Sequence, residues 1–505
     1  MLYVDVSDFL EYARFNSTLT GIQRVSAVLI NRLTKRLGVD GFRLIAYHPN
    51  KRTVQTYSPE HFAGDYVYDQ LRYCAYFDLL LEYGDTVHAV SLRAYVRKRY
   101  GKGLPSHLHT LRLLIANAVS GGQAFQRRNI VRNPGASAAE EPKLVPGDTV
   151  FVPGAIWNMP AFRDHLTALS ERGVEIIQLL HDLIPLVTPE HVFESVPRQF
   201  AEWLDSMARI VSVFVVSSRA TEADLRVFLD RNGHTKAAIR VVTLAHEFLR
   251  APAADEAPFA PVAVFRPELA GRIRQWALNE SRLPYVLVVG TIESRKNIWT
   301  LALVWKSLYD ELGHRLPRLI FAGKRGGMKD DFDAFMRATG GLYGYIRILE
   351  RPNDDELAYL YEHCLFSVFV SYYEGWGLPV GECLWFGRPV IASSASSTPE
   401  VGGTLADYAD PYDFVSIRQA VRRMIVDDEY REQRASRIDR ANLRTWADFA
   451  DELWSVLQAH AGPVQSRSAE PAEPISSGNG LGWSGAALPR PTPGAGDRAE
   501  SPALN

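Results

Sequence analysis

The chain alternates short apolar runs with longer stretches in which apolar positions recur at helical spacing. The apolar runs of the first half have the length and β-branched content of buried strands. They are Leu2–Val6, Phe42–Tyr47, Thr86–Val90, Thr149–Val152, Ile176–Leu180 and Val213–Val216. A helix is expected from Thr20 to about Arg36. Near-continuous apolar strands separated by helices predict a parallel sheet that is covered by helices on both faces.

A second series of the same kind begins after residue 284. Its predicted strands are Tyr285–Val289, Arg318–Phe321, Tyr345–Ile348, Ser367–Val370 and Pro389–Ala392, with helices beginning at Asn297, Asp354 and Pro379. Residues 251–284 are rich in Ala and Pro and are predicted to connect the two series. The expected fold class is therefore α/β, with Rossmann-like doubly wound domains over residues 1–250 and 285–461. Ligands of such open sheets bind at the carboxyl ends of the strands, so we expect a cleft between the domains.

Two segments depart from this pattern. Residues 93–133 hold nine Lys or Arg and no Asp or Glu, and residues 93–147 are predicted to be a basic, partly irregular insert. In residues 462–505, 14 of 44 residues are Gly or Pro. Because that composition cannot bury enough apolar surface to offset the entropy of ordering, a disordered tail is predicted.

Bulk composition narrows the class of protein. A chain of 505 residues is too long for one hydrophobic core, which agrees with two domains. The net charge of −2 gives no global attraction to nucleic acid, and no nucleic-acid recognition motif accompanies the basic segment. Three scattered cysteines fit a reducing compartment. With no signal-peptide pattern and no long apolar run, we expect a cytoplasmic protein.

Candidate chemistry gathers in the segment from Glu374 to Glu382, which follows a predicted strand. Gly375 and Gly377 permit tight turns, and Pro379 suits the first turn of a helix. The segment would therefore bring a helix N-terminus, which favours a diphosphate, to the sheet edge with a carboxylate on each side. Alternatively, the glycines form an ordinary turn and Glu382 only complements the helix dipole.

Further motifs decide between these interpretations. The pattern Glu-Gly-aromatic-Gly-Leu-Pro-x-x-Glu resembles the signature of retaining glycosyltransferases of family 4, which have the GT-B fold. Other landmarks of that family follow in the same order and spacing over about residues 284–412. They are Gly290-Thr291-Ile292-Glu293-Ser294-Arg295-Lys296-Asn297, Ala322-Gly323-Lys324, Asp354-Asp355-Glu356-Leu357, Gly387-Arg388-Pro389 and Ser397-Thr398-Pro399-Glu400. In the first half, Thr20-Gly21-Ile22-Gln23-Arg24-Val25 and Leu180-His181-Asp182 resemble a polysaccharide-building, mannosyltransferase-like branch.

This resemblance implies a role for each matched residue. Glu382 would accept from the donor ribose, Glu374 would contact the transferred sugar, and Lys296 with Arg295 would neutralise the leaving diphosphate. The remaining predicted donor contacts are Gly375, Trp376, Gly377, Leu378, Gly290 and Thr291. His181 is the third predicted catalytic residue and would contact the sugar or acceptor. Gly21 and Arg24 are assigned to an acceptor or phosphate loop, with a plain turn and a solvated helix residue as alternatives.

The Arg295–Lys296 pair makes a divalent metal unnecessary, so neither metal nor cofactor is expected. Many relatives carry an arginine where this chain has Thr291, which places more of the neutralisation on Arg295 and Lys296. Asn297 is either a helix N-cap or a ligand contact. The proton of the acceptor hydroxyl would pass to the leaving phosphate oxygen, so no protein base is named.

The sequence thus predicts a retaining hexosyltransferase that moves a sugar, with GDP-mannose or a related donor favoured, to a glycan or polyprenyl-linked acceptor in bacterial cell-surface polysaccharide synthesis. The basic segment would touch the inner face of the cytoplasmic membrane, or else be a solvated insert. Alternatives on the same fold are a nucleotide-sugar epimerase, a sugar phosphorylase, for which no pyridoxal-phosphate lysine context is found, and a non-catalytic glycan- or nucleotide-binding protein.

Overall fold

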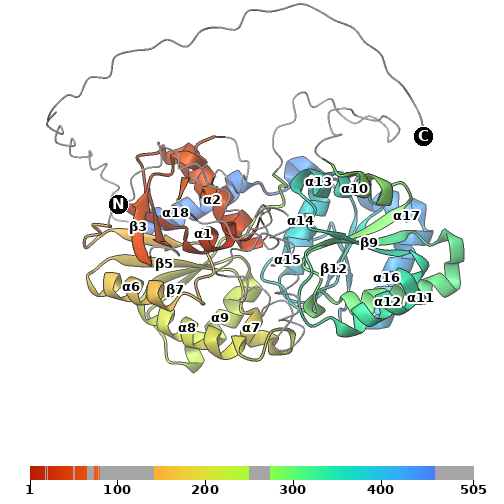
Figure 1. Ribbon diagram of the computed structural model, residues 1–505, viewed down its shortest axis with the longest axis horizontal. Coiled ribbons are helices and arrows are strands. Elements are labelled where there is room, and N and C mark those ends of the chain that lie inside the picture. The colour runs from red at the N-terminus through yellow and green to blue at the C-terminus, as the bar shows by residue number, and fades with distance from the viewer. Residues whose placement is uncertain are drawn as a thin grey trace, which may run out of the picture. The chain divides into compact units, whose positions relative to one another are not determined.

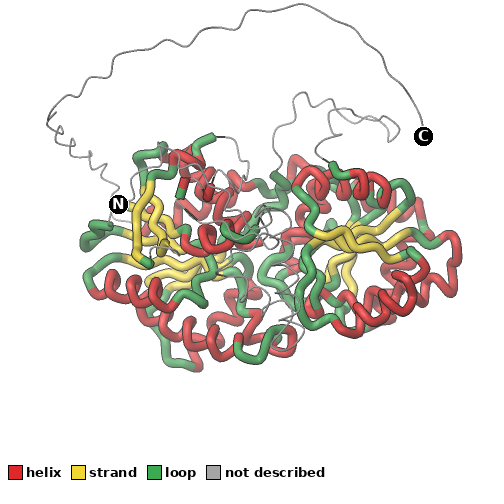
Figure 2. Tube along the Cα trace, viewed as in Figure 1, coloured by secondary structure: helices red, strands yellow, loops and turns green. Residues whose placement is uncertain are grey.

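The computed structural model describes residues 1–16, 19, 21–48, 52–64, 73–74, 76–77, 79, 142–249 and 273–460. These residues form two sheets, each with helices on both faces (Figures 1 and 2). The predicted strand at 86–90, the basic segment 93–133 and the tail 462–505 lie outside the described residues.

The N-terminal sheet has seven strands in the order β3-β2-β1-β4-β5-β6-β7. Their bounds are β1 Leu2–Asp5, β2 Arg43–His48, β3 Thr53–Tyr57, β4 Thr149–Val152, β5 Glu175–Leu180, β6 Val211–Val216 and β7 Ala238–Val241. The helices of this part are α1 Ser7–Ala13, α2 Gly21–Leu37, α6 Pro160–Glu171, α7 Ile184–Val187, α8 Val196–Ile210 and α9 Arg219–Arg231.

The N-terminal sheet carries one antiparallel edge strand in addition to the predicted parallel strands. Strand β3 pairs antiparallel with β2, in a register that sets Leu44 opposite Tyr57. The connection between these strands is too short for a parallel crossover, so the chain returns as a hairpin. The sequence of β3, Thr-Val-Gln-Thr-Tyr, is half polar and lacks the continuous apolar run that marked the other strands.

The C-terminal sheet has six parallel strands in the order β10-β9-β8-β11-β12-β13. Their bounds are β8 Tyr285–Val289, β9 Arg318–Gly323, β10 Ile346–Glu350, β11 Ser367–Phe369, β12 Val390–Ser393 and β13 Asp407–Ala409. The helices that follow are α11 Ile298–Leu312, α12 Asp330–Tyr343, α13 Asp354–His363, α14 Leu378–Trp385, α15 Thr398–Gly402, α16 Phe414–Val426 and α17 Asp428–Ser436. The predicted strands and helix starts of this half agree with the structure to within two residues.

Both ends of the predicted C-terminal domain are placed differently in the structure. Helix α10 (Gln275–Glu280) lies within the predicted connection. Its last residue, Glu280, forms ion pairs with Arg318 and Arg347 of the C-terminal sheet. Helix α18 (Trp446–His460) instead packs on α2 of the N-terminal sheet (Figure 1). Its apolar stripe predicts a buried helix face, but periodicity alone does not reveal which sheet that face covers.

The strand order places two loops of the C-terminal sheet side by side. Strand β8 comes first in this sheet, yet it lies between β9 and β11. The chain therefore leaves β8 toward one side and β11 toward the other, which makes their carboxyl ends the topological switch point of the sheet. The loops that begin at Gly290 and Val370 open there, and they carry the predicted donor residues.

Candidate donor-binding site

A cavity of about 420 Å³ lies where the carboxyl ends of the two sheets meet. Both halves of the chain supply its walls, and every site residue predicted from the sequence is among them. These are Gly21, Arg24, His181, Gly290, Thr291, Arg295, Lys296, Glu374, Gly375, Trp376, Gly377, Leu378 and Glu382. The structure thus brings the predicted residues together, while the role of each stays a prediction.

The loop after β11 delivers the start of α14 to this cavity. Gly377 has φ +111°, a conformation that side chains with a Cβ rarely adopt, and the helix begins at the next residue, Leu378. Pro379 lies in the first helical turn, where its missing N–H costs nothing. The start of α14, with the positive end of its dipole, therefore lines the cavity.

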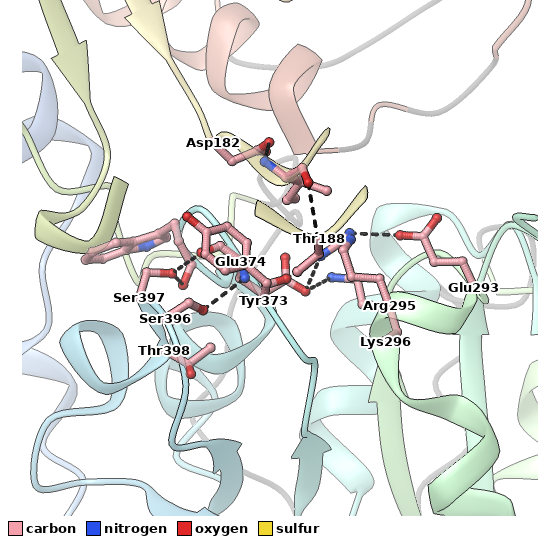
Figure 3. Close-up of polar contacts among 12 residues, drawn as sticks. Asp182, Thr188, Glu293, Arg295, Lys296, Tyr373, Glu374, Ser396, Ser397 and Thr398 are labelled. Carbon is pink, nitrogen blue, oxygen red and sulfur yellow. Dashed lines mark hydrogen bonds and ion pairs between the residues drawn. The ribbon is translucent and has the colours of Figure 1, made fainter. Parts of the chain in front are cut away.

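Two serines hold the loop in place. The Ser397 hydroxyl donates to the carbonyls of Glu374 and Trp376, at 2.9 and 2.8 Å. The backbone N–H of Glu374 donates to Ser396 Oγ at 2.9 Å. Ser397 begins the landmark Ser397-Thr398-Pro399-Glu400 and Ser396 directly precedes it, which explains why a motif after β12 accompanies the glycine loop (Figure 3).

Glu374 is the centre of a buried ion-pair cluster. Its Oε1 lies 2.5 Å from Lys296 Nζ and 2.8 Å from Arg295 Nη1, and its side chain is 9% exposed. Arg295 also donates to the Tyr373 carbonyl and to Glu293 Oε1 (Figure 3). Burial alone would raise the pKa of Glu374, but the two cations outweigh it and hold that pKa at about 2. Glu374 is therefore an ionised acceptor at neutral pH.

The two cations differ in how many N–H donors remain for a further anion. The guanidinium of Arg295 contacts Tyr373, Glu374 and Glu293, so it fixes the loop after β8 to the loop after β11. Lys296 donates a hydrogen bond to Glu374, and its ammonium has three N–H groups. Lys296 is thus the cation with more capacity for a further anion. Its Nζ also lies 4.6 Å from the ring centre of Phe369.

Glu382 has a different environment, one helical turn into α14. Its Oε2 accepts from the Tyr361 hydroxyl at 2.9 Å, and its Oε1 lies 3.5 Å from Arg24 Nη1. Burial raises the pKa of Glu382, and Arg24 and Tyr361 only partly oppose that rise. The two acids of the motif are therefore unequal, since one is held ionised by two adjacent cations and the other has one cation at long range.

The end of β5 lies directly against the glycine loop. A Cβ on Gly375 would come within 2.0 Å of the His181 carbonyl oxygen, so only glycine fits there. The Ser217 hydroxyl, after β6, donates to the Gly375 carbonyl at 3.0 Å. These contacts fix the loop of one domain on the strand ends of the other.

His181 is held as a neutral ring. Its Nε2 donates to the Pro153 carbonyl at 2.7 Å, which leaves Nδ1 as the acceptor nitrogen. Burial lowers the pKa of His181 to about 4. The adjacent Asp182 accepts from the backbone N–H of Ile184, and burial raises its pKa.

The loop after β8 makes close contacts of its own. A Cβ on Gly323, at the end of β9, would lie 1.9 Å from the Gly290 carbonyl oxygen, and Gly290 has φ +141°. Asn297 is not a side-chain N-cap of α11, because its amide donates to the Pro411 carbonyl at 2.8 Å. Gly21 has φ +43° and begins α2, as the prediction of a helix from residue 20 implies.

Several residues that line the cavity were not predicted from the sequence as site residues. They are Tyr12, Asn16, Gln23, Asp182, Ser217, Lys324, Arg351 and Leu357. Lys324 and Asp182 lie in quoted motifs and follow strands, so strand-end polarity was a usable signal. Ser217 also directly follows a strand, β6, whereas Tyr12 carries no such signal, because only the folded chain brings it to the cavity.

Among the described residues, no group of three or more His, Cys, Asp or Glu side chains has the arrangement of a metal site. In the same part of the chain, no helix is long and apolar enough to cross a membrane.

The sequence model of a known family, Glycosyl transferases group 1, matches residues 272–440. The match covers most of the C-terminal domain, including the loops after β8 and β11. Two curated relatives from Escherichia coli agree with this. O-antigen chain mannosyltransferase B is 39% identical over 148 residues, which is 29% of this chain. Serotype-specific mannosyltransferase WbdA is 24% identical over 322 residues, which is 63% of this chain. In both cases the match spans 38% of the relative's own length.

Solved structures extend the fold assignment to both domains of the chain. HepE of Anabaena in complex with UDP and glucose superposes with a TM-score of 0.51, at 12% identity over 91% of this chain and 100% of that one. Sucrose-phosphate synthase of Thermosynechococcus elongatus gives 0.52, at 15% identity over 91% and 98%. The fold is GT-B, as the sequence analysis predicted.

Proposed function

We propose that this chain is a retaining hexosyltransferase that transfers a sugar from a nucleotide-sugar donor to a glycan acceptor. The observation that carries the proposal is the meeting of Arg295 and Lys296 with Glu374 at the start of α14, in one cavity with Glu382. Cations, helix N–H groups and two separated carboxylates suit the three parts of such a donor, which are diphosphate, sugar and ribose.

The reaction exchanges one bond at the anomeric carbon for another. The bond from that carbon to the diphosphate oxygen breaks, and the diphosphate leaves with the electron pair. The acceptor hydroxyl forms the new bond on the same face and gives its proton to the leaving phosphate oxygen, so no protein base is required. Lys296 and the start of α14 stabilise the charge that builds on the diphosphate, a contribution that is often the largest in catalysis.

The two acids bind different parts of the donor. Glu374 Oε1 is held by its two cations, and we propose that Oε2 accepts from a hydroxyl of the sugar and steadies positive charge at its anomeric carbon. Glu382 accepts from the ribose. Neutral His181 accepts through Nδ1 from a sugar or acceptor hydroxyl. Gly290 and Thr291 line the part of the cavity in which we propose that the diphosphate binds.

GDP-mannose is the donor we propose, in the synthesis of a bacterial cell-surface polysaccharide. The mannosyltransferase relatives support it, since one is 39% identical over 148 residues and the other 24% identical over 322 residues of this chain. Metal independence is part of the proposal, since Lys296 and Arg295 supply the positive charge. We propose a polyprenyl-linked acceptor at the inner membrane face, supported by the basic composition of residues 93–133.

A donor panel tests the function. GDP-mannose and other GDP- and UDP-sugars are incubated with the full chain, with and without EDTA, and nucleoside diphosphate release and thermal shift are recorded. We expect release from GDP-mannose that EDTA does not reduce, and a product whose anomeric configuration by NMR matches the donor. Absence of both release and thermal shift with every donor contradicts a transferase. A new donor epimer without transfer would indicate an epimerase.

Membrane contact has a separate test. We expect sedimentation with vesicles that contain an anionic lipid such as phosphatidylglycerol and not with pure phosphatidylcholine, and a decrease as salt rises. Equal binding to both vesicle types, or none to either, contradicts the membrane proposal alone.

A further inference from the structure

Arg24 crosses from the N-terminal half of the cavity to the C-terminal half. It lies in the first turn of α2 and is 7% exposed. Its guanidinium forms an ion pair with Asp354 at the start of α13 and lies 3.5 Å from Glu382 Oε1. It also lies over the ring of Phe248, 5.3 Å from the ring centre. The sequence analysis assigned Arg24 to an acceptor or phosphate loop, but the partners in the structure are carboxylates.

The contact with Glu382 is long, and this matters for a ligand. At 3.5 Å the Arg24 nitrogen attracts the carboxylate without forming a short hydrogen bond. The other oxygen, Oε2, has an ordinary bond from Tyr361 at 2.9 Å. A carboxylate oxygen offers two lone pairs, so Oε1 retains acceptor capacity toward a hydroxyl in the cavity.

We propose that Arg24 is a positioning residue for the donor: from the N-terminal domain it holds the Glu382 carboxylate ready to accept from the ribose hydroxyls of a nucleoside diphosphate. This rests on the proposed function, in which Glu382 binds the ribose. Nucleotide affinity, which the C-terminal domain supplies through Glu382, thereby depends on one residue of α2.

The charge around Glu382 supports this role. Burial raises the pKa of Glu382 and Asp354 raises it further, whereas Arg24 and the Tyr361 hydroxyl lower it. His246, which packs on Gly381, has a lowered pKa because of burial, and its ring nitrogens meet the Val401 carbonyl and the Arg444 N–H. Arg24 thus opposes the rise in the pKa of Glu382 and favours the ionised carboxylate, which accepts hydrogen bonds more strongly than a protonated one.

The test measures nucleotide affinity across pH. GDP and UDP are titrated calorimetrically into the full-length wild type, Arg24→Gln and Arg24→Lys between pH 5 and 8.5. Arg36→Gln is the matched control, because Arg36 is on the same helix and pairs with Asp451 of α18, away from the cavity. For Arg24→Gln we expect roughly tenfold weaker binding near pH 7. The pH below which affinity falls should also rise, because Glu382 now takes up its proton sooner.

Arg24→Lys keeps the charge, so we expect the wild-type pH midpoint with a smaller loss of affinity. If Arg24→Gln does not fold, Arg24→Lys still tests the proposal. Wild-type affinity and midpoint in Arg24→Gln would overturn the inference, as would a midpoint in Arg24→Lys equal to that of Arg24→Gln. A failure of the proposed function differs from either result. In that case the wild type binds neither nucleotide, or Glu382→Gln binds as the wild type does.

Discussion

The two acids of the glycine-loop motif lie eight positions apart in the chain, yet the fold gives them opposite surroundings. Glu374 lies where the loops after β8 and β11 converge, and two cations on one oxygen hold its pKa at about 2. Glu382 lies in α14, where burial raises its pKa and the cation near it comes from the N-terminal domain. Two acids of the same motif can therefore have different chemistry, because strand order decides which charges surround each acid.

This contrast has a mechanistic consequence. A carboxylate that stays ionised suits a position beside developing positive charge at the anomeric carbon. A carboxylate with a raised pKa suits recognition of neutral hydroxyls, and its strength as an acceptor depends on its neighbours. We therefore expect changes near Glu374 to affect turnover and changes near Glu382 to affect nucleotide affinity.

The largest expected effect is that of Lys296→Met. The variant removes the cation that has most capacity for the leaving diphosphate, while Arg295 still pairs with Glu374. We expect kcat for donor turnover to fall roughly 100- to 1,000-fold. Lys306→Met is a matched control, since Lys306 is exposed on α11 and pairs with Asp310. Turnover within a few-fold of the wild type in the Lys296 variant would remove the electrostatic role.

The next effect concerns the contact between the glycine loop and the end of β5. Gly375→Ala places a methyl group 2.0 Å from the His181 carbonyl oxygen, so the loop must move away from the N-terminal domain. We expect roughly tenfold lower activity and a lower melting temperature. In Gly64→Ala no atom of the described residues lies within 4 Å of the new methyl, so this variant should behave as the wild type. Equal behaviour of the two variants would show that the close packing is not needed.

The pH dependence of nucleotide binding separates the two acids. As pH falls, Glu382 takes up a proton before Glu374, because burial raises the pKa of Glu382 while the pKa of Glu374 is held at about 2. We therefore expect GDP affinity of the wild type to decrease toward pH 5. In Glu382→Gln this decrease should vanish, and in Glu374→Gln it should persist. Isothermal titration at a series of pH values measures both, and a decrease that only Glu374→Gln abolishes would reverse the assignment.

The smallest effect is expected at Glu400. Its two carboxylate oxygens accept from the backbone N–H groups of Arg219 and Ala220, at 2.9 and 3.0 Å, so it caps α9 from the other domain. Glu400→Ala should cost about 1 kcal/mol of unfolding free energy, the usual value of a lost helix cap. Chemical denaturation measures it, with turnover changing little. A large loss of turnover without loss of stability would instead place Glu400 in the site.

The sequence predicted the parallel core of both domains because buried parallel strands are continuous apolar runs. It did not predict β3 or β7, whose strands mix polar and apolar residues. The motif residues could be assigned to a cavity since strand ends and glycine loops are local features. The partners of Arg24, Ser217 and α18 could not, because each depends on contacts between segments that are distant in the chain.

The central claim is that Glu374 and Glu382 divide the donor between them. The most direct measurement compares Glu374→Gln and Glu382→Gln for turnover of the preferred nucleotide-sugar and for the Kd of its nucleoside diphosphate. We predict that Glu374→Gln lowers kcat roughly 100-fold with a nearly unchanged nucleotide Kd, and that Glu382→Gln raises that Kd roughly tenfold with a much smaller change in kcat. The same loss of both quantities in the two variants, or the reverse pattern, would contradict the account.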